Sequence, residues 1–244
     1  MNKAMIPWAL AALVLTVLAL PAAAAAEAVE LESKTLKVTV DSEFPRIIQY
    51  KNKADGTTLD GQTEPVSTVE LNGKTEPCGI TFKKRGADTA EYRLEFPRAK
   101  VEASLGVTVG ANVVELGMTE IRENGTVKVK TIAFPGNAWL TLRSSQPDAF
   151  IASVHYSTVE APVCAVFRET FGPLASLKPG ADTASYFFCS AGALAAGIAS
   201  NHIYDVQRAA FVIAEKDGVK TCAAQNPEWL YRHVPGETVG LPWV

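Results

Sequence analysis

Four turn dipeptides that end in glycine divide this chain into short segments of alternating apolar and polar residues. The dipeptides are Asp55-Gly56, Asn72-Gly73, Asn124-Gly125 and Asp217-Gly218. Asn, Asp and Gly tolerate the positive φ angles that tight turns require, so strand-like residues on both sides of such a dipeptide predict a β-hairpin. We therefore expect four hairpins and a chain that is β-structured almost throughout.

The segments between the turns show the period-2 pattern of half-buried strands. The clearest cases, in which apolar residues alternate with Thr or Lys, are 36–40, 107–109 and 127–129. Helical patterns are scarce: residues 191–200 are rich in alanine, but two glycines weaken a helix there, and a buried strand of small side chains fits equally well. Because a long antiparallel sheet must curl or split into packed layers, the expected fold class is an all-β sandwich.

The first 26 residues have the order of a secretory signal peptide. Lys3 precedes an apolar run over 4–20, and small residues follow at 22–26. The alternative is a membrane anchor, but a spanning helix needs about 20 apolar residues and no basic cluster follows this run. We therefore expect cleavage after residue 26, one mature domain over 27–244, a secreted or periplasmic location and no membrane attachment after cleavage.

The charge balance argues against a nucleic-acid partner. Without Lys3, 22 basic residues stand against 26 acidic ones, which gives a formal charge of −4. A nucleic-acid-binding domain normally presents a basic patch, and no such concentration stands out in this chain.

The cysteine pattern predicts no metal centre. Cys78, Cys164, Cys189 and Cys222 are widely spaced and form no CxxC motif. Export would permit disulfides, and four cysteines allow three pairings. Free buried thiols are the first expectation, and Cys189–Cys222 is the candidate disulfide to test first, because both residues lie in strand-like segments near the C-terminus.

No catalytic motif is present, and no cofactor is expected. The chain has no GxSxG elbow, HExxH motif, P-loop or dinucleotide fingerprint. His155, His202 and His233 are isolated, and a structural or surface role fits each better than that of a general base. No catalytic residue is therefore assigned.

Aromatic residues are the remaining candidates for contact with a sugar. Trp139 is expected to fill the core. Trp229, Tyr231 and Trp243 lie in a segment rich in Pro and Gly, and core packing, contact with a following domain and contact with carbohydrate all stay open for them.

Several short segments, taken in their order along the chain, resemble one known family of domains. The resemblance is to the β-sandwich domain that precedes the catalytic barrel in endo-α-N-acetylgalactosaminidases (glycoside hydrolase family 101), which remove O-linked disaccharides from mucin-type glycoproteins. The segments are Leu36-Lys-Val-Thr-Val40, Phe44-Pro-Arg-Ile-Ile-Gln-Tyr50, Leu59-Asp-Gly-Gln62, Leu71-Asn-Gly-Lys74, Lys130-Thr-Ile132, Leu142-Arg-Ser-Ser-Gln-Pro147 and Leu194-Ala-Ala-Gly-Ile-Ala-Ser-Asn201.

The resemblance implies a galactose-mutarotase-like supersandwich and a non-catalytic role. In that family the nucleophilic Asp and the acid/base Glu belong to the following TIM barrel, so no catalytic residue carries over to this chain. The expected partner is a mucin-type O-glycan, contacted through such a barrel. Two alternatives stay open: a standalone exported carbohydrate-binding or structural β-sandwich and, with less support, a mutarotase-like enzyme.

Overall fold

The computed structural model describes residues 27–157, 166–184, 186–198, 209–225 and 229–230. These residues form antiparallel β-strands and one turn of 3-10 helix, η1 (Leu174–Ser176), without any α-helix. The all-β prediction is thus confirmed. No helix in the described ranges has the length and apolarity needed to cross a membrane. The predicted signal peptide lies outside the described residues.

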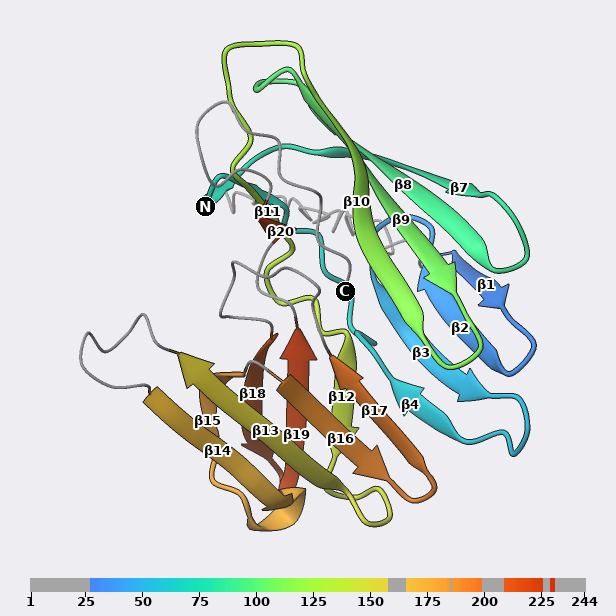
Figure 1. Cartoon of the computed structure of the whole chain (residues 1–244), viewed down its shortest axis with the longest axis vertical. Coiled ribbons are helices and arrows are strands. Elements are labelled where there is room, and N and C mark those ends of the chain that lie inside the picture. The colour runs from blue at the N-terminus through green and yellow to red at the C-terminus, as the bar shows by residue number, and fades with distance from the viewer. Residues whose placement is uncertain (1–26, 158–165, 185, 199–208, 226–228, 231–244) are drawn as a thin grey trace, which may run out of the picture.

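A long eight-stranded sheet forms the base of the molecule (Figure 1). Alternation of buried and exposed residues along its strands turns one face of the sheet toward the core. Its strands in spatial order are β1 (Ala28–Glu32), β2 (Leu36–Asp41), β3 (Ile47–Asn52), β4 (Thr58–Asp60), β12 (Leu140–Arg143), β19 (Val219–Gln225), β18 (Ala209–Lys216) and β15 (Gly180–Ala184).

A second sheet packs against the β1–β3 end of the long sheet (Figure 1). A hydrogen bond joins the two sheets: the hydroxyl of Tyr92 in the second sheet donates to the carbonyl oxygen of Asp41 in the long sheet at 2.5 Å. Strictly alternating burial along β9 directs its Val, Ala and Leu side chains into the core. The strand order is β10 (Val114–Glu123), β9 (Val101–Val109), β8 (Thr89–Phe96) and β7 (Gly79–Lys84).

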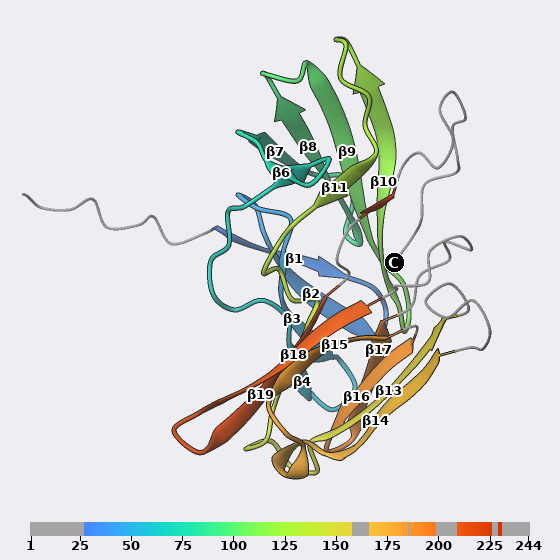
Figure 2. The same cartoon turned by 90° about the vertical axis from the view of Figure 1, so that its left-hand side faces the viewer.

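A third sheet covers the other end of the long sheet. Figure 2 shows the two layers, with β13 and β14 on one side and β18 and β19 on the other. Phe187 and Phe211 meet between the layers, with ring centroids 5.4 Å apart. The strand order is β14 (Val166–Pro173), β13 (Phe150–Ser157), β16 (Tyr186–Ala191) and β17 (Leu194–Ile198).

A small fourth sheet includes Trp229, one of the aromatic residues singled out from the sequence. Ile132 pairs with Leu71 on one side and with Trp229 on the other. Only the backbone of Trp229 is described. The strand order is β20 (Trp229–Leu230), β11 (Thr131–Ala133), β5 (Glu70–Leu71) and β6 (Lys74–Thr75).

Three of the four predicted hairpins form. Asn72-Gly73 and Asp217-Gly218 have positive φ at both positions and join β5 to β6 and β18 to β19 through two-residue turns. Asp55-Gly56 also joins two strands, β3 and β4, but only Gly56 has positive φ. The Asn52 amide donates to the Thr57 carbonyl oxygen, so this loop has four residues, in contrast to the two-residue turns of the other two hairpins.

The hairpin predicted at Asn124-Gly125 is wrong. Among the described strands, β10 pairs only with β9, and residues 126–130 form no strand. The side chain of Asn72 holds this segment instead: its amide donates to the Lys128 carbonyl at 2.9 Å, and its oxygen accepts the Lys130 amide at 2.7 Å. A hydrogen-bonding side chain from a distant turn thus takes the place of a strand partner.

The corner between β2 and β3 contains a buried ion pair. Arg46 Nε donates to Asp41 Oδ2 at 2.6 Å, and both side chains are only 4% exposed. Arg46 Nη1 also donates to the carbonyl oxygens of Thr63 at 3.1 Å and Gln62 at 3.3 Å. The pair therefore fixes the chain that follows β4 against the corner.

Candidate functional site

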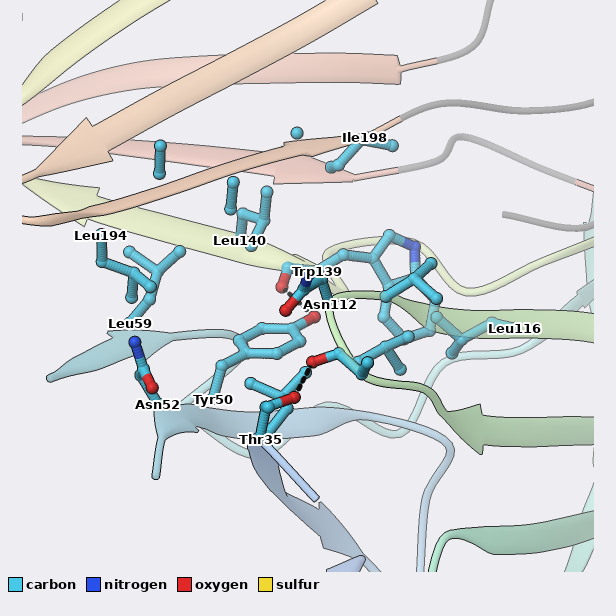
Figure 3. Close-up of a pocket in the computed structure, with 17 residues that line it drawn as sticks. Thr35, Tyr50, Asn52, Leu59, Asn112, Leu116, Trp139, Leu140, Leu194 and Ile198 are labelled. Atoms are coloured by element: carbon cyan, nitrogen blue, oxygen red, sulfur yellow. Dashed lines mark hydrogen bonds between the residues drawn. The ribbon is translucent and has the colours of Figure 1, made fainter. Parts of the chain in front are cut away.

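A pocket of about 430 Å³ lies where the long sheet, the β9–β10 turn and strand β17 meet (Figure 3). This volume lies in the range of about 300–1,000 Å³ found for small-molecule sites. The lining residues are Thr35, Leu36, Tyr50, Asn52, Leu59, Ala111, Asn112, Val113, Val114, Leu116, Trp139, Leu140, Leu194, Ala195, Ala196, Gly197 and Ile198.

The pocket brings together segments that the sequence analysis matched separately to one family. Leu36, Tyr50 and Leu59 come from three of these segments, and Leu194 and Ile198 come from a fourth. These positions are up to 162 residues apart in the chain. Pairing of β2, β3 and β4 aligns the first three, and the packing of β17 over the long sheet brings in the fourth.

Two hydrogen bonds give the pocket its shape. The Tyr50 hydroxyl donates to the Trp139 carbonyl oxygen at 2.8 Å, which fixes the phenol ring along one wall. The Thr35 hydroxyl donates to the Ala111 carbonyl oxygen and holds the β9–β10 turn against the start of β2. Trp139 is 3% exposed, which confirms its predicted place in the core.

The chemistry of the lining suits binding better than proton transfer. Among the described residues, neither a carboxylate nor an imidazole lines this pocket. Burial raises the pKa of the Tyr50 phenol well above its ordinary value, so the phenol stays protonated near neutral pH. Asn52 and Asn112 supply amide groups at the edge of apolar walls. This combination fits an amphipathic neutral molecule, which has both an apolar face and hydroxyl groups.

The predicted aromatic contacts are only partly covered by the structure. Trp229 lies in β20 beside Ile132, with its side chain not described, while Tyr231 and Trp243 fall outside the described residues. Their role in carbohydrate or domain contact therefore stays a prediction. Tyr50 could not be assigned to a pocket from the sequence, because the pattern of its strand indicates partial burial but not which elements the ring faces.

The candidate disulfide partners Cys189 and Cys222 are free thiols in this structure. They lie on β16 and β19, and both are buried between the two layers, at 4% and 1% exposure. Burial raises the pKa of each thiol to about 12. Cys78 is also free, and Cys164 lies outside the described residues. Within the described residues, no group of His, Cys, Asp and Glu could hold a metal ion.

Comparison with known proteins places this architecture in one family. The profile described as galactose mutarotase-like fold domain matches residues 31–244. A protein of Renibacterium salmoninarum named as an endo-alpha-N-acetylgalactosaminidase is 25% identical over 243 residues. The alignment covers 89% of this chain and 16% of that protein, so the chain spans less than a fifth of the curated relative that it matches.

Solved structures of low sequence identity also align with the chain. A galactose mutarotase-like protein from Lactobacillus casei aligns with a TM-score of 0.47 at 8% identity, over 81% of this chain and 87% of its own. The GH36 alpha-galactosidase AgaA from Geobacillus stearothermophilus aligns with a TM-score of 0.45 at 10% identity, over 89% of this chain and 40% of its own. On the strength of the profile match, which spans residues 31–244 of the 244-residue chain, the protein belongs to the family of galactose mutarotase-like fold domains.

Proposed function

We propose that this chain is the non-catalytic, carbohydrate-associated domain of an exported endo-α-N-acetylgalactosaminidase-like glycoside hydrolase that acts on mucin-type O-glycans. The observation that carries the proposal is the family match, together with a pocket whose described lining has no group able to exchange a proton near neutral pH. The chemistry would then be supplied by a TIM barrel outside this chain.

The pocket supports a role in holding a neutral sugar. The ring of Tyr50 and the side chains of Val113 and Leu194 offer apolar surface for the C–H face of a pyranose. Asn112 is exposed at the rim, where its amide can bond to sugar hydroxyls. Binding of this kind needs no titratable group, in agreement with the lining observed.

Hydrolysis provides the first test of the proposal. The purified mature chain is incubated with desialylated mucin, and released Gal-β1,3-GalNAc is measured. We expect none. Release of the disaccharide that persists through purification, and disappears when a single Glu or His of this chain is replaced, would overturn the non-catalytic assignment.

Tryptophan fluorescence provides the second test, because Trp139 lines the pocket. Galactose and GalNAc are titrated to millimolar concentration, and a saturable change in emission is expected. Asn112→Ala should weaken this response, whereas Asn124→Ala, which removes an exposed amide away from the pocket, should leave it unchanged. If neither sugar produces a saturable change in emission, the pocket is not a sugar-binding site and that part of the proposal is wrong.

A further inference from the structure

The outer face of the sheet β14-β13-β16-β17 carries exposed aromatic side chains. Phe171, Tyr186 and Phe188 are 71%, 58% and 55% exposed, and they are three of the five large apolar side chains found exposed in the described part of the chain. All three belong to this one sheet, which lies in front of the long sheet in Figure 1. We call these three residues the aromatic platform.

The strand register places the platform residues in neighbouring rows. Ala152 of β13 pairs with Phe171 on one side and Phe188 on the other, so the two phenylalanines flank a small residue. Their Cα atoms are therefore two strand spacings apart, about 10 Å. Val154 pairs with Tyr186, which puts Tyr186 one row further along the same face.

Neighbouring residues hold two of the rings in place. Phe171 packs edge to face against Phe150, with ring centroids 4.8 Å apart and an angle of 84° between the rings. The Phe188 ring lies over Gly197, where a Cβ atom would come within 2.7 Å of its Cδ1. The platform thus consists of oriented rings, and ordering them costs little side-chain entropy on binding.

The area of this face argues against a second protein chain as its occupant. Three strand spacings and the eight residues of β13 and β14, the longest strands of this sheet, outline a surface of at most about 14 by 27 Å, roughly 380 Å². A stable protein–protein interface needs about 800 Å² from each partner. A saccharide chain, by contrast, can be held by a few exposed rings against which its sugar rings pack.

The charge of this face indicates a neutral occupant. Its outward-facing described residues on β13, β16 and β17 are Phe150, Ala152, Val154, Tyr186, Phe188, Ser190, Ala195 and Gly197, none of which is charged. Glu169 on β14 lies at the edge, opposite Val154, and would repel an anionic sugar. We propose that the aromatic platform is a contact surface for a neutral glycan chain; none of its three rings lines the pocket, which this face meets only at Ala195 and Gly197 of β17.

This inference rests on the proposed carbohydrate association and adds a second surface to it. The test is native gel electrophoresis of the full mature chain through gels that contain desialylated mucin, with chemically deglycosylated mucin as the parallel probe. We expect the wild-type chain to be retarded only by the glycosylated form. Phe171→Ala and Phe188→Ala should each reduce the retardation, and the double variant should lose it.

Matched variants separate stacking from general loss of apolar surface. Phe188→Tyr keeps an aromatic ring and should retain the retardation, while Val212→Ala removes a similarly exposed apolar side chain on β18 and should have no effect. Three outcomes would each overturn the proposal that the platform binds glycan: no retardation of the wild-type chain, equal retardation by deglycosylated mucin, or unchanged retardation of the double variant. Self-association in analytical ultracentrifugation that Phe171→Ala abolishes would also overturn it, in favour of a second copy. Hydrolysis of the mucin would instead defeat the non-catalytic assignment, which the retardation assay does not measure.

Discussion

Replacement of Arg46 tests whether the buried ion pair at the β2–β3 corner holds the fold together. The substitution Arg46→Met keeps the length of the aliphatic stem but removes the guanidinium. It abolishes the hydrogen bond to Asp41 and those to the carbonyl oxygens of Gln62 and Thr63. One Asp41 oxygen still accepts the Glu43 amide, but its negative charge then has no cationic partner in this buried position.

The expected loss follows from the burial of both partners. Because each side chain is only 4% exposed, solvent cannot replace the missing cation, and removing one partner of a buried pair costs about 3–5 kcal/mol. Arg93 provides the matched control: its Nη2 atom lies 2.6 Å from Glu102 Oε2, but its side chain is 49% exposed. Such surface pairs contribute about 0–1 kcal/mol, so Arg93→Met should change little.

The measurement is urea-induced unfolding at pH 7, followed by tryptophan fluorescence. We expect the free energy of unfolding to fall by about 3–5 kcal/mol in Arg46→Met and by no more than about 1 kcal/mol in Arg93→Met. Arg46→Lys, which keeps the charge but not the planar group of donors, should lie between them and remains measurable if Arg46→Met does not fold.

A double-variant cycle completes the test. Asp41→Leu combined with Arg46→Met removes both charges, so the pair of substitutions should cost less than the sum of the single ones. If Arg46→Met is no more destabilising than Arg93→Met, or if the two single effects simply add, the ion pair does not hold the corner and the reasoning is wrong.

Two further predictions concern a close backbone approach and the buried thiols. At Gly61 a Cβ would overlap the Ile47 carbonyl oxygen and come within 2.9 Å of the Ile47 carbonyl carbon, so Gly61→Ala should lower the free energy of unfolding by about 1–3 kcal/mol. Gly180→Ala is the control and should leave this free energy unchanged, because nothing lies within 4 Å of a Cβ at that position. Equal effects of the two substitutions in urea unfolding would refute the prediction. Because burial raises the pKa of Cys189 and Cys222 from 9.0 to about 12, the free energy of unfolding should fall as pH rises from about 9 toward 12, and it should fall less steeply in Cys222→Ala. Both thiols should also resist alkylation by iodoacetamide at pH 8 until denaturant is added. If the unfolded chain is not alkylated in the absence of reductant, the two cysteines form a disulfide instead.

The sequence predicted the parts of the fold that depend on local backbone chemistry. Asn72-Gly73 and Asp217-Gly218 form two-residue turns because their residues adopt positive φ without large strain. Asn124-Gly125 has the same composition, yet no hairpin forms there. The deciding interaction is the side chain of Asn72, more than 50 residues away, which bonds to the backbone at Lys128 and Lys130. No local pattern could reveal it.

The candidate site was less predictable because its walls come from distant strands. The alternation around Tyr50 indicates a half-buried strand, but not that this ring faces β17 and the β9–β10 turn across a pocket. From the sequence, Trp229, Tyr231 and Trp243 were candidates for sugar or domain contact because they lie in a segment rich in Pro and Gly, with core packing left open as well. It also could not place Phe171 and Phe188 on one face, which depends on the order of β14, β13 and β16.

Strand β17 explains why its sequence fitted both a helix and a buried strand. Leu194 and Ile198 face the pocket side, whereas Gly197 faces outward beneath the Phe188 ring. Ala195 and Gly197 are exposed on that outer face, and the position beneath the ring has room only for a residue without a side chain, which glycine satisfies. The same residues raise helix propensity in a composition-based reading. The spacing of larger side chains at 194 and 198 does not discriminate, because four residues separate same-face positions in a helix and in a strand alike. Only the pairing with β16, which supplies the ladder, selects the strand.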